Sequence, residues 1–359
     1  MRVDRSDDAL DTLFQPLADG VLRWPEQGGA LFLHARDGIG LRQQPRPGLV
    51  CEQGFKPEVD ALHRAGLDTV DLDTLDPARR FPLVLVLPPR QRDEARALFA
   101  QAIARTAPGG RVLACMRNDE GARSGETDLG RIAGPVGSLS KRKCRAFWTA
   151  PLDGAADPAQ AAAWAAFDAP REILGGRFVS RPGVFAWDRI DTASALLAAH
   201  LPSDLRGHAA DLGAGYGYLS AELLARCPGV VAVDLYEAQA RALELARTNL
   251  SRVATTAELE FHWHDVTAGL DRGYDVIVSN PPFHGQGRDE RPDLGRRFIA
   301  VAAEALNPGG RLWLVANRHL PYESVLDERF GQVRIVAQRG GFKVVEAIKH
   351  SKAPGRARA

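Results

Sequence analysis

Val276-Ile277-Val278-Ser279-Asn280-Pro281-Pro282-Phe283-His284 is the stretch that decides the fold of this chain. Its apolar, β-branched first half predicts a buried strand. Pro281 and Pro282 end that strand, because proline lacks the N–H that a sheet ladder requires and has a fixed φ. The corner therefore lies just past a strand end, where open α/β sheets bind their ligands. The amide of Asn280, a backbone carbonyl and the ring of Phe283 would meet there and suit a planar substrate with an exocyclic NH2.

The composition is that of an ordinary globular protein. A length of 359 residues favours two domains, and 45% apolar with 25% charged residues is typical of globular chains. The net charge is only +1, so any affinity for nucleic acid must come from local basic patches. The four cysteines are scattered without a C-x-x-C pair, so we expect reduced thiols, no disulfide framework and no metal site. No apolar run approaches the roughly 18 residues of a membrane span. The N-terminus is polar, so we expect no signal peptide and a cytoplasmic location.

The C-terminal half alternates predicted strands and helices. Alternation of this kind predicts an α/β fold with a doubly wound, mostly parallel sheet, here of seven strands with a C-terminal antiparallel hairpin. The predicted strands are 208–212, 230–235, 259–263, 274–279 and 311–316; the helices are 218–226, 237–250 and 294–306, the last ending at a Pro-Gly-Gly cap; the hairpin strands are 333–337 and 342–348.

The N-terminal half repeats this plan. An apolar strand at 81–87 again precedes a double proline, a helical stretch follows, and Pro-Gly-Gly-Arg at 108–111 parallels Pro-Gly-Gly-Arg at 308–311. The first copy has no glycine-rich turn, and Leu87 stands where the second has Asn280. The fold expected is therefore two tandem Rossmann-like methyltransferase-type domains, the first degenerate. We expect this first domain at 1–152, a connector at 153–170, the catalytic domain at 171–350 and a flexible basic tail at 351–359.

A glycine-rich turn, Asp211-Leu-Gly-Ala-Gly-Tyr-Gly217, follows a predicted strand and opens a helix. Glycines let the backbone turn tightly and approach a ligand closely. Position 218 is not glycine, so the dinucleotide fingerprint is absent and NAD is disfavoured. A purely structural tight turn would have the same sequence. The pattern predicts two further carboxylates, Asp234 and Asp265, at the next two strand ends, where they could accept the ribose hydroxyls and the adenine amine. Each carboxylate alone is more often a helix cap or a solvated charge, but together they indicate an adenosyl compound without a pyrophosphate, namely S-adenosylmethionine.

Methyl transfer to a conjugated purine amine depends on positioning. The side-chain oxygen of Asn280 and the carbonyl of Pro281 could each accept one N–H and turn the lone pair toward the methyl group. Phe283 would stack on the base, which must be flipped out or unpaired. His284 is a possible base, although a histidine beside a site is more often a hydrogen-bonding wall residue. The histidines at 262 and 264 alternate on a strand without a third ligand, so no metal is expected.

The chain resembles the bacterial ribosomal RNA guanine-N2 methyltransferases, both type C, which modify the small ribosomal particle, and their relatives that modify the large one. The resemblance is carried by Arg181-Pro-Gly-Val-Phe185, Asp191, Ser279 to His284, Val315-Ala-Asn317, Leu320-Pro-Tyr322, Leu326 to Gly331 and Phe342-Lys-Val344. It implies methylation of guanine N2 in ribosomal RNA, 16S rather than 23S. It further implies two tandem domains, a monomer, and target-base binding by residues 280–283. The cofactor residues that it implies are Asp211, Gly213, Gly215, Gly217, Asp234, Asp265, Val266 and Asn280, with Phe185 and Asp191 lining the pocket.

A basic segment in the first half, Lys141, Arg142 and Lys143, precedes two aromatic residues and is a candidate RNA contact together with His284. A solvated basic face would look the same. Asn-Pro-Pro-aromatic corners also serve methyltransferases of DNA adenine N6 and of protein glutamine amides, so these substrates stay open. A catalytically silent RNA-binding assembly factor is the third alternative.

Overall fold

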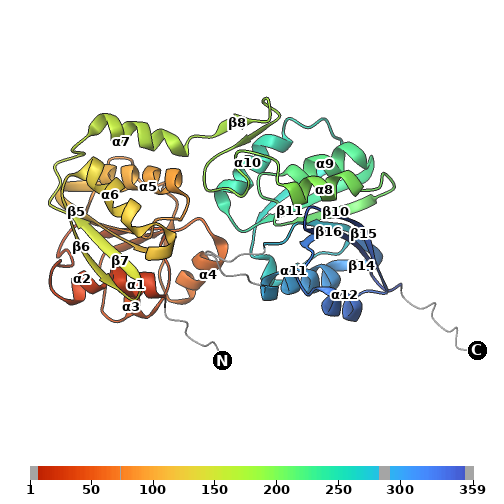
Figure 1. Cartoon of the computed structure of the whole chain (residues 1–359), viewed down its shortest axis with the longest axis horizontal. Helices are drawn as coiled ribbons and strands as arrows, with labels where there is room; N and C mark the ends of the chain where they lie inside the picture. The colour runs from red at the N-terminus through yellow and green to blue at the C-terminus, as the bar shows by residue number, and fades with distance from the viewer. Residues whose placement is uncertain (1–6, 73, 283–291, 352–359) are drawn as a thin grey trace, which may run out of the picture. The chain divides into compact units, whose positions relative to one another are not determined.

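The computed structural model describes residues 7–72, 74–282 and 292–351, and the chain divides into two compact units. The first unit comprises residues 1–170 and 181–183, and the second comprises 171–180 and 184–359. Each unit is built on one seven-stranded sheet (Figure 1). None of the described helices is long and apolar enough to cross a membrane.

The second unit contains the sheet predicted from the alternating pattern. Its strands run in the order β12-β11-β10-β13-β14-β16-β15, with the first five parallel and β16 antiparallel to both β14 and β15. The strands are β10 (Arg206–Leu212), β11 (Gly229–Glu237), β12 (Glu258–Trp263), β13 (Tyr274–Ser279), β14 (Leu306–Asn317), β15 (Gln332–Arg339) and β16 (Phe342–Ile348). The carboxyl ends of the five parallel strands therefore share one edge, which is where the site lies.

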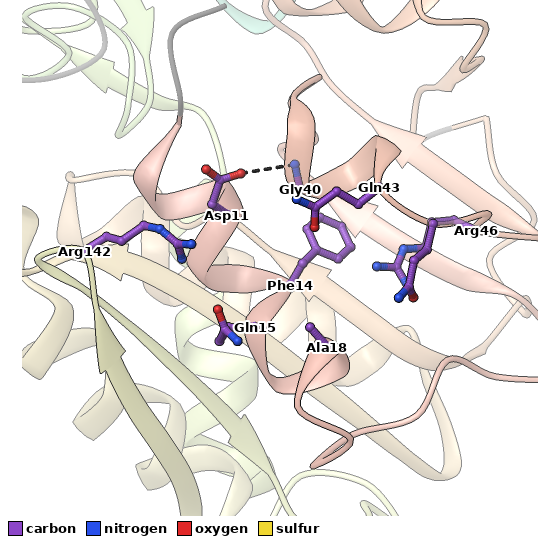
Figure 2. Close-up of a pocket in the computed structure, with 9 residues that line it drawn as sticks. Asp11, Phe14, Gln15, Ala18, Gly40, Gln43, Arg46 and Arg142 are labelled. Atoms are coloured by element: carbon purple, nitrogen blue, oxygen red, sulfur yellow. Dashed lines mark hydrogen bonds between the residues drawn. The ribbon is translucent and has the colours of Figure 1, made fainter.

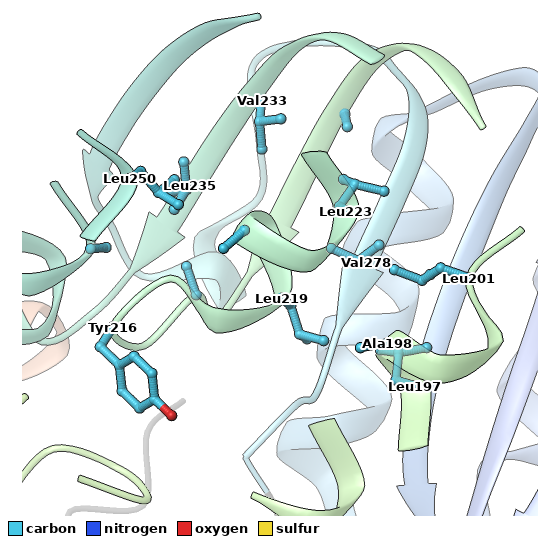
Figure 3. Packing of buried hydrophobic residues seen from close by; sticks show 14 of the residues in the cluster. Leu197, Ala198, Leu201, Tyr216, Leu219, Leu223, Val233, Leu235, Leu250 and Val278 are labelled. Carbon is cyan, nitrogen blue, oxygen red and sulfur yellow. The ribbon is translucent and has the colours of Figure 1, made fainter. Parts of the chain in front are cut away.

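Helices cover both faces of this sheet, so its strands are almost continuously apolar. On β14, Trp313 and Val315 join the core under one set of helices, while Leu312 and Leu314 join the core under the other. Figure 3 shows the first of these cores, in which Leu223 and Val233 are fully buried. Burying each such side chain contributes about 1.5–3 kcal/mol. The first face carries α8 (Thr192–His200), α9 (Tyr218–Arg226) and α10 (Ala240–Leu250); the second carries α11 (Pro292–Ala305), the 3-10 turn η3 (Val266–Ala268) and α12 (Glu323–Arg329). A separate hairpin pairs β8 (Arg171–Ile173) with β9 (Phe178–Ser180).

The first unit repeats the plan strand for strand. Its order β3-β2-β1-β4-β5-β7-β6 is the order of the second sheet with each strand replaced by its counterpart. Its strands are β1 (Ala30–Leu33), β2 (Leu49–Glu52), β3 (Thr69–Val70), β4 (Phe81–Val86), β5 (Thr106–Arg117), β6 (Val136–Lys141) and β7 (Cys144–Thr149). Its helices are α1 (Asp8–Leu13), α2 (Gln15–Ala18), α3 (Ile39–Arg42), α4 (Lys56–Arg64), α5 (Arg92–Ala104), α6 (Ala122–Ala133) and α7 (Pro158–Ala165), with 3-10 turns η1 (Asn118–Glu120) and η2 (Ala166–Asp168).

Strand register makes the duplication specific at single residues. The last residue of β4 pairs with the last residue of β1, as the last residue of β13 pairs with that of β10. Leu87 therefore occupies the position of Asn280, as the sequence predicted. A second correspondence was not predicted. Glu52 ends β2 and accepts the His34 amide at 3.0 Å, just as Glu237 ends β11 and accepts the Gly215 amide at 2.8 Å.

Three boundaries differ from the prediction. Strand β11 continues to Glu237, because it pairs with β12 as far as Trp263, and helix α10 begins only at residue 240. The Pro-Gly-Gly segment at 308–310 lies inside β14 and not in a helix cap, since α11 already ends at residue 305. The predicted connector at 153–170 belongs to the first unit: Trp164 of α7 is buried in its core, and the Arg96 guanidinium lies 5.0 Å from the Trp164 ring.

Candidate functional site

The glycine-rich turn joins β10 to α9 as predicted. Gly213, Gly215 and Gly217 all have positive φ, at 78°, 55° and 89°. A Cβ added at Gly215 would meet no atom within 4 Å, so the turn leaves open space at this point. Gly217, in contrast, is buried, and an added Cβ would come within 3.3 Å of Ala246 in α10. Its glycine is thus explained by helix packing and not by the predicted contact with a cofactor.

Asp211 lies beneath this turn and is completely buried. Its Oδ2 accepts the Ser220 hydroxyl at 2.7 Å, while its Oδ1 is buried without a hydrogen-bond partner in the part of the chain that the structure describes. Burial raises the pKa of Asp211 to about 7, and the neighbouring Glu237 raises it further, although the Ser220 bond acts in the opposite direction. An unsatisfied carboxylate oxygen below an open turn fits a cationic or N–H-donating ligand group.

Asp234 does not end its strand, and this prediction was wrong. It lies three residues before the end of β11, buried to 1% exposure, with the Tyr274 hydroxyl donating to its Oδ2 at 2.6 Å. The Arg272 guanidinium lies 3.5 Å from the same oxygen. This carboxylate is therefore satisfied inside the sheet, away from the edge that carries the glycine turn.

Glu237 is the acidic residue at the end of β11, and the sequence analysis missed it. Its Oε2 accepts the Gly215 amide at 2.8 Å and its Oε1 accepts the Gln239 amide at 2.8 Å. Burial raises its pKa. These bonds bring a carboxylate against the open glycine turn. The signal that could have revealed it is the apolar run of β11, which continues past Asp234 through Leu235 and Tyr236 before the next acidic residue.

Asp265 follows β12 by two residues and caps the 3-10 turn η3. Its Oδ1 accepts both the amide of Thr267 at 2.9 Å and the Thr267 hydroxyl at 2.7 Å. Val266 is buried at 3% exposure, and the amide of His264 donates to the Glu237 carbonyl at 3.0 Å. The structure therefore brings Asp265 and Val266 to the same sheet edge as Glu237.

Asn280 follows the last residue of β13, and the orientation of its amide is defined. Its Nδ2 donates to Asp191 Oδ2 at 3.0 Å and to Ser194 Oγ at 2.9 Å, so the carboxylate takes one amide hydrogen. Since a carboxylate only accepts, the NH2 group must face Asp191. Asn280 Oδ1 is buried and has no hydrogen-bond partner among residues 7–72, 74–282 and 292–351. The corner thus presents one preset acceptor. Pro281 is buried and Pro282 is exposed.

The segment that carries Phe185 and Asp191 is tied to the site at two points. Asp191 caps α8, accepting the Ser194 amide at 2.8 Å, and also holds Asn280. The Tyr216 hydroxyl, from the glycine turn, donates to the Arg189 carbonyl at 3.1 Å. Phe185 is 65% exposed, so the structure leaves its predicted place in a cofactor pocket open to solvent.

The remaining predicted residues lie elsewhere. Phe283 and His284 are outside the described residues. Lys141, Arg142 and Lys143 belong to the first unit, where they form the end of β6 and the turn before β7.

Two kinds of comparison connect this site with known proteins. A family model described as the methyltransferase small domain matches residues 175–346. The chain is 32% identical over 282 residues to the ribosomal RNA small subunit methyltransferase C of Salmonella paratyphi A, covering 78% of this chain and 77% of that protein. It is 31% identical over 268 residues to the protein of the same name from Shewanella amazonensis, covering 74% of this chain and 76% of that protein.

Among solved structures, the T. thermophilus 16S rRNA N2 G1207 methyltransferase in complex with AdoMet and guanosine is similar along nearly its whole length. The TM-score is 0.78 at 25% sequence identity, with 97% of this chain and 93% of that chain covered. The similarity therefore includes both units and not only the one with the glycine turn.

Proposed function

The chain belongs to the ribosomal RNA small subunit methyltransferase C family, and from that premise we propose that its second unit methylates the exocyclic N2 of a guanosine in 16S ribosomal RNA. The enzyme is an S-adenosylmethionine-dependent ribosomal RNA methyltransferase. The RNA in an assembling small ribosomal subunit is the proposed partner, and the proposed active species is a monomer. Residues 171–350 are the proposed catalytic part, and residues 1–152 the proposed RNA-binding part.

The observation that carries the proposal is the fixed amide of Asn280. Both of its recorded donor contacts go to Asp191 and Ser194, and its buried Oδ1 is left to accept. Leaving a buried acceptor unpaired costs about 1–3 kcal/mol, so the free protein contains an acceptor that a substrate N–H would satisfy. An exocyclic amine has two such hydrogens, and we assign the second to the carbonyl of Pro281.

Residues at the ends of β10, β11 and β12 are suited to hold S-adenosylmethionine, which supplies an electrophilic methyl group on a sulfonium. The unpaired Asp211 Oδ1 lies below the open Gly213–Gly215 turn and matches the cofactor's ammonium group. Glu237 is the proposed acceptor of the ribose hydroxyls, in place of Asp234. Asp265 and the backbone of Val266 are proposed to contact the adenine.

The chain's own residues prepare the amine for attack. Accepting both N–H groups at Asn280 and Pro281 removes the nitrogen lone pair from conjugation with the ring and aims it along one line. As the nitrogen–carbon bond forms, the carbon–sulfur bond breaks and its electron pair stays on sulfur. The nitrogen then carries a positive charge, which makes its proton strongly acidic, so that proton can leave to water without a strong base. Positioning of this kind can supply much of the rate.

The carboxyl edge of the second sheet changes sign of charge across its width. Beside β11 and β12 it carries the carboxylates of Glu237 and Asp265. After β14 and at the end of β15 it carries Arg318, His319 and Arg339, all of them exposed. The turn after β14 is fixed by the bond from the Arg318 amide to the Gly341 carbonyl at 2.7 Å. An acidic side suits a sulfonium nucleoside, and a cationic side suits the phosphates that flank a flipped nucleotide.

Labelled S-adenosylmethionine and undermethylated small ribosomal subunits test the proposal. After the reaction, nuclease digestion and mass spectrometry should recover the label as N2-methylguanosine from 16S RNA. An Asn280→Ala enzyme should lose about 10²–10³ in turnover, by analogy with the loss of one aligned oxyanion donor. Label found only as N6-methyladenosine, or only in protein, would refute the substrate assignment.

A further inference from the structure

A small pocket in the first unit gathers cationic and amide side chains that the methyl-transfer site does not use. It lies between the helices α1 and α2, the segment after α3, and the turn between β6 and β7 (Figure 2). Its volume of about 80 Å³ equals roughly two to three water molecules, which admits one phosphate group and excludes a base. Arg142 lies on one side of the Phe14 ring and Arg46 on the other, with Gln15 and Gln43 between them.

Arg46 is held with an unused donor. Its guanidinium lies 4.8 Å from the centre of the Phe14 ring and 4.9 Å from that of Trp24. Its Nε is buried without an acceptor, and no ion pair with a carboxylate involves Arg46 within the described part of the chain. Burial also lowers the pKa of this guanidinium. A cation held between two aromatic rings with an unpaired N–H is positioned to take an anion.

Arg142 reaches the same pocket from a strained hairpin tip. Arg142 and Lys143 both have positive φ, at 50° and 57°, although neither is glycine or asparagine. Such a conformation costs roughly 1–2 kcal/mol for each residue. Backbone strain of this kind points to a functional use of the side chains that are kept there. The hairpin is anchored, because Lys141 Nζ donates to Gln15 Oε1 at 2.7 Å and the Thr12 hydroxyl donates to the Lys141 carbonyl at 3.3 Å.

The charge balance of the pocket leaves room for one anion. Asp11 also lines it, but its Oδ1 accepts the Gly40 amide at 3.1 Å. Two guanidinium groups against one carboxylate leave a net charge of +1, which one phosphodiester would neutralise. The amides of Gln15, Gln43 and Gln44 add further hydrogen-bonding groups to the lining.

We propose that this pocket binds a single phosphodiester of the RNA substrate, held between Arg46 and Arg142. The proposal rests on the RNA methyltransferase function above and assigns to the first unit a defined contact in place of a general basic face. Lys143 is adjacent to Arg142, has the same backbone conformation and the same charge, and does not line the pocket. It is therefore the matched control.

The test compares the full-length Arg142→Asn and Lys143→Asn proteins in binding to a 16S RNA transcript over a series of salt concentrations. Asparagine tolerates positive φ, so both variants should melt at or above the temperature of the wild type. Arg142→Asn should weaken binding about tenfold and reduce the salt slope by about one. Lys143→Asn should weaken binding less than threefold. Equal losses in the two variants, or no loss in either, would overturn the pocket.

A second variant and a kinetic readout separate this proposal from the function on which it rests. Arg46→Lys keeps the charge but removes the planar fork, and should also weaken binding. If both arginines hold one phosphate, the loss in the double variant should be smaller than the product of the single losses. In methylation assays Arg142→Asn should raise KM for RNA and leave kcat unchanged. A wild-type enzyme that methylates no ribosomal RNA would contradict the proposed function, whereas active wild type with an unaltered Arg142→Asn enzyme contradicts only the pocket.

Discussion

Replacing Asp191 by alanine tests how the acceptor of the active site is oriented. Asp191 Oδ2 accepts the Asn280 Nδ2 at 3.0 Å, and this bond fixes Asn280 Oδ1 on the opposite side. A hydrogen bond to a charged group contributes about 1.5–3 kcal/mol. Because each 1.36 kcal/mol of barrier changes a rate tenfold, complete loss of this orientation would slow turnover by about 10- to 150-fold. Ser194 still accepts the amide at 2.9 Å, so we expect the lower part of that range.

The same substitution also affects stability, and a second variant separates the two effects. Asp191 caps α8 by accepting the Ser194 amide at 2.8 Å, and losing an N-cap costs about 1 kcal/mol. Asp191→Asn keeps a good N-cap, but an amide can present either its oxygen or its NH2 to Asn280. It should therefore melt like the wild type and still turn over more slowly. Ser194→Ala removes the other acceptor and should have a smaller effect on turnover than Asp191→Ala.

The measurements are kcat and KM with undermethylated small ribosomal subunits, the Kd of S-adenosylmethionine by calorimetry, and thermal unfolding. A positioning role for Asp191 requires that kcat falls while cofactor affinity stays within about twofold. If kcat is unchanged and cofactor binding weakens instead, Asp191 is a cofactor ligand, as the sequence first suggested, and the orientation argument fails.

Three further predictions use matched pairs or pH. Glu237→Gln should weaken S-adenosylmethionine binding about tenfold, whereas Asp234→Asn should mainly lower thermal stability; calorimetry and melting of both variants that show the reverse would return the ribose contact to Asp234. Arg318→Ala should raise KM for RNA several-fold, while Arg206→Ala, an exposed arginine at the opposite edge of the same sheet, should not; equal KM values would remove the cationic edge from RNA binding. The raised pKa of about 7 for Asp211 means that the folded protein retains a proton that the unfolded chain loses near pH 4, so this group's contribution to stability falls as pH rises from about 4 to 7 and is constant above it. Asp211→Asn should lack that loss in denaturant unfolding measured across this range, and a parallel pH profile for both proteins would exclude the effect.

The features that could be predicted from sequence are those encoded locally. The corner after β13 was predictable because two consecutive prolines stop a strand wherever they occur. The glycine turn was predictable because only glycine readily adopts three positive φ values so close together. The duplicated strand order followed from two similar local patterns, and the shared topology of the two sheets confirms it.

The contacts between distant segments could not be predicted in this way. Asp234 and Glu237 are three residues apart, and the sequence favoured the first because it follows a short apolar run. Its neighbour Tyr274 is 40 residues away, and only the folded sheet brings that hydroxyl within 2.6 Å. Strand length was likewise set by pairing with β12, which is invisible in the sequence of β11 alone.

The sequence by itself determined the succession of elements, the turn, and the corner that carries Asn280, because backbone preference and apolar periodicity act over a few residues. The tertiary structure decided which carboxylate meets the turn and which way the Asn280 amide faces. Asp191 precedes Asn280 by 89 positions, and their hydrogen bond exists only because α8 packs beside the end of β13. Burial and hydrogen bonding depend on which surfaces meet in three dimensions, and that is settled when the sheet and its helices assemble.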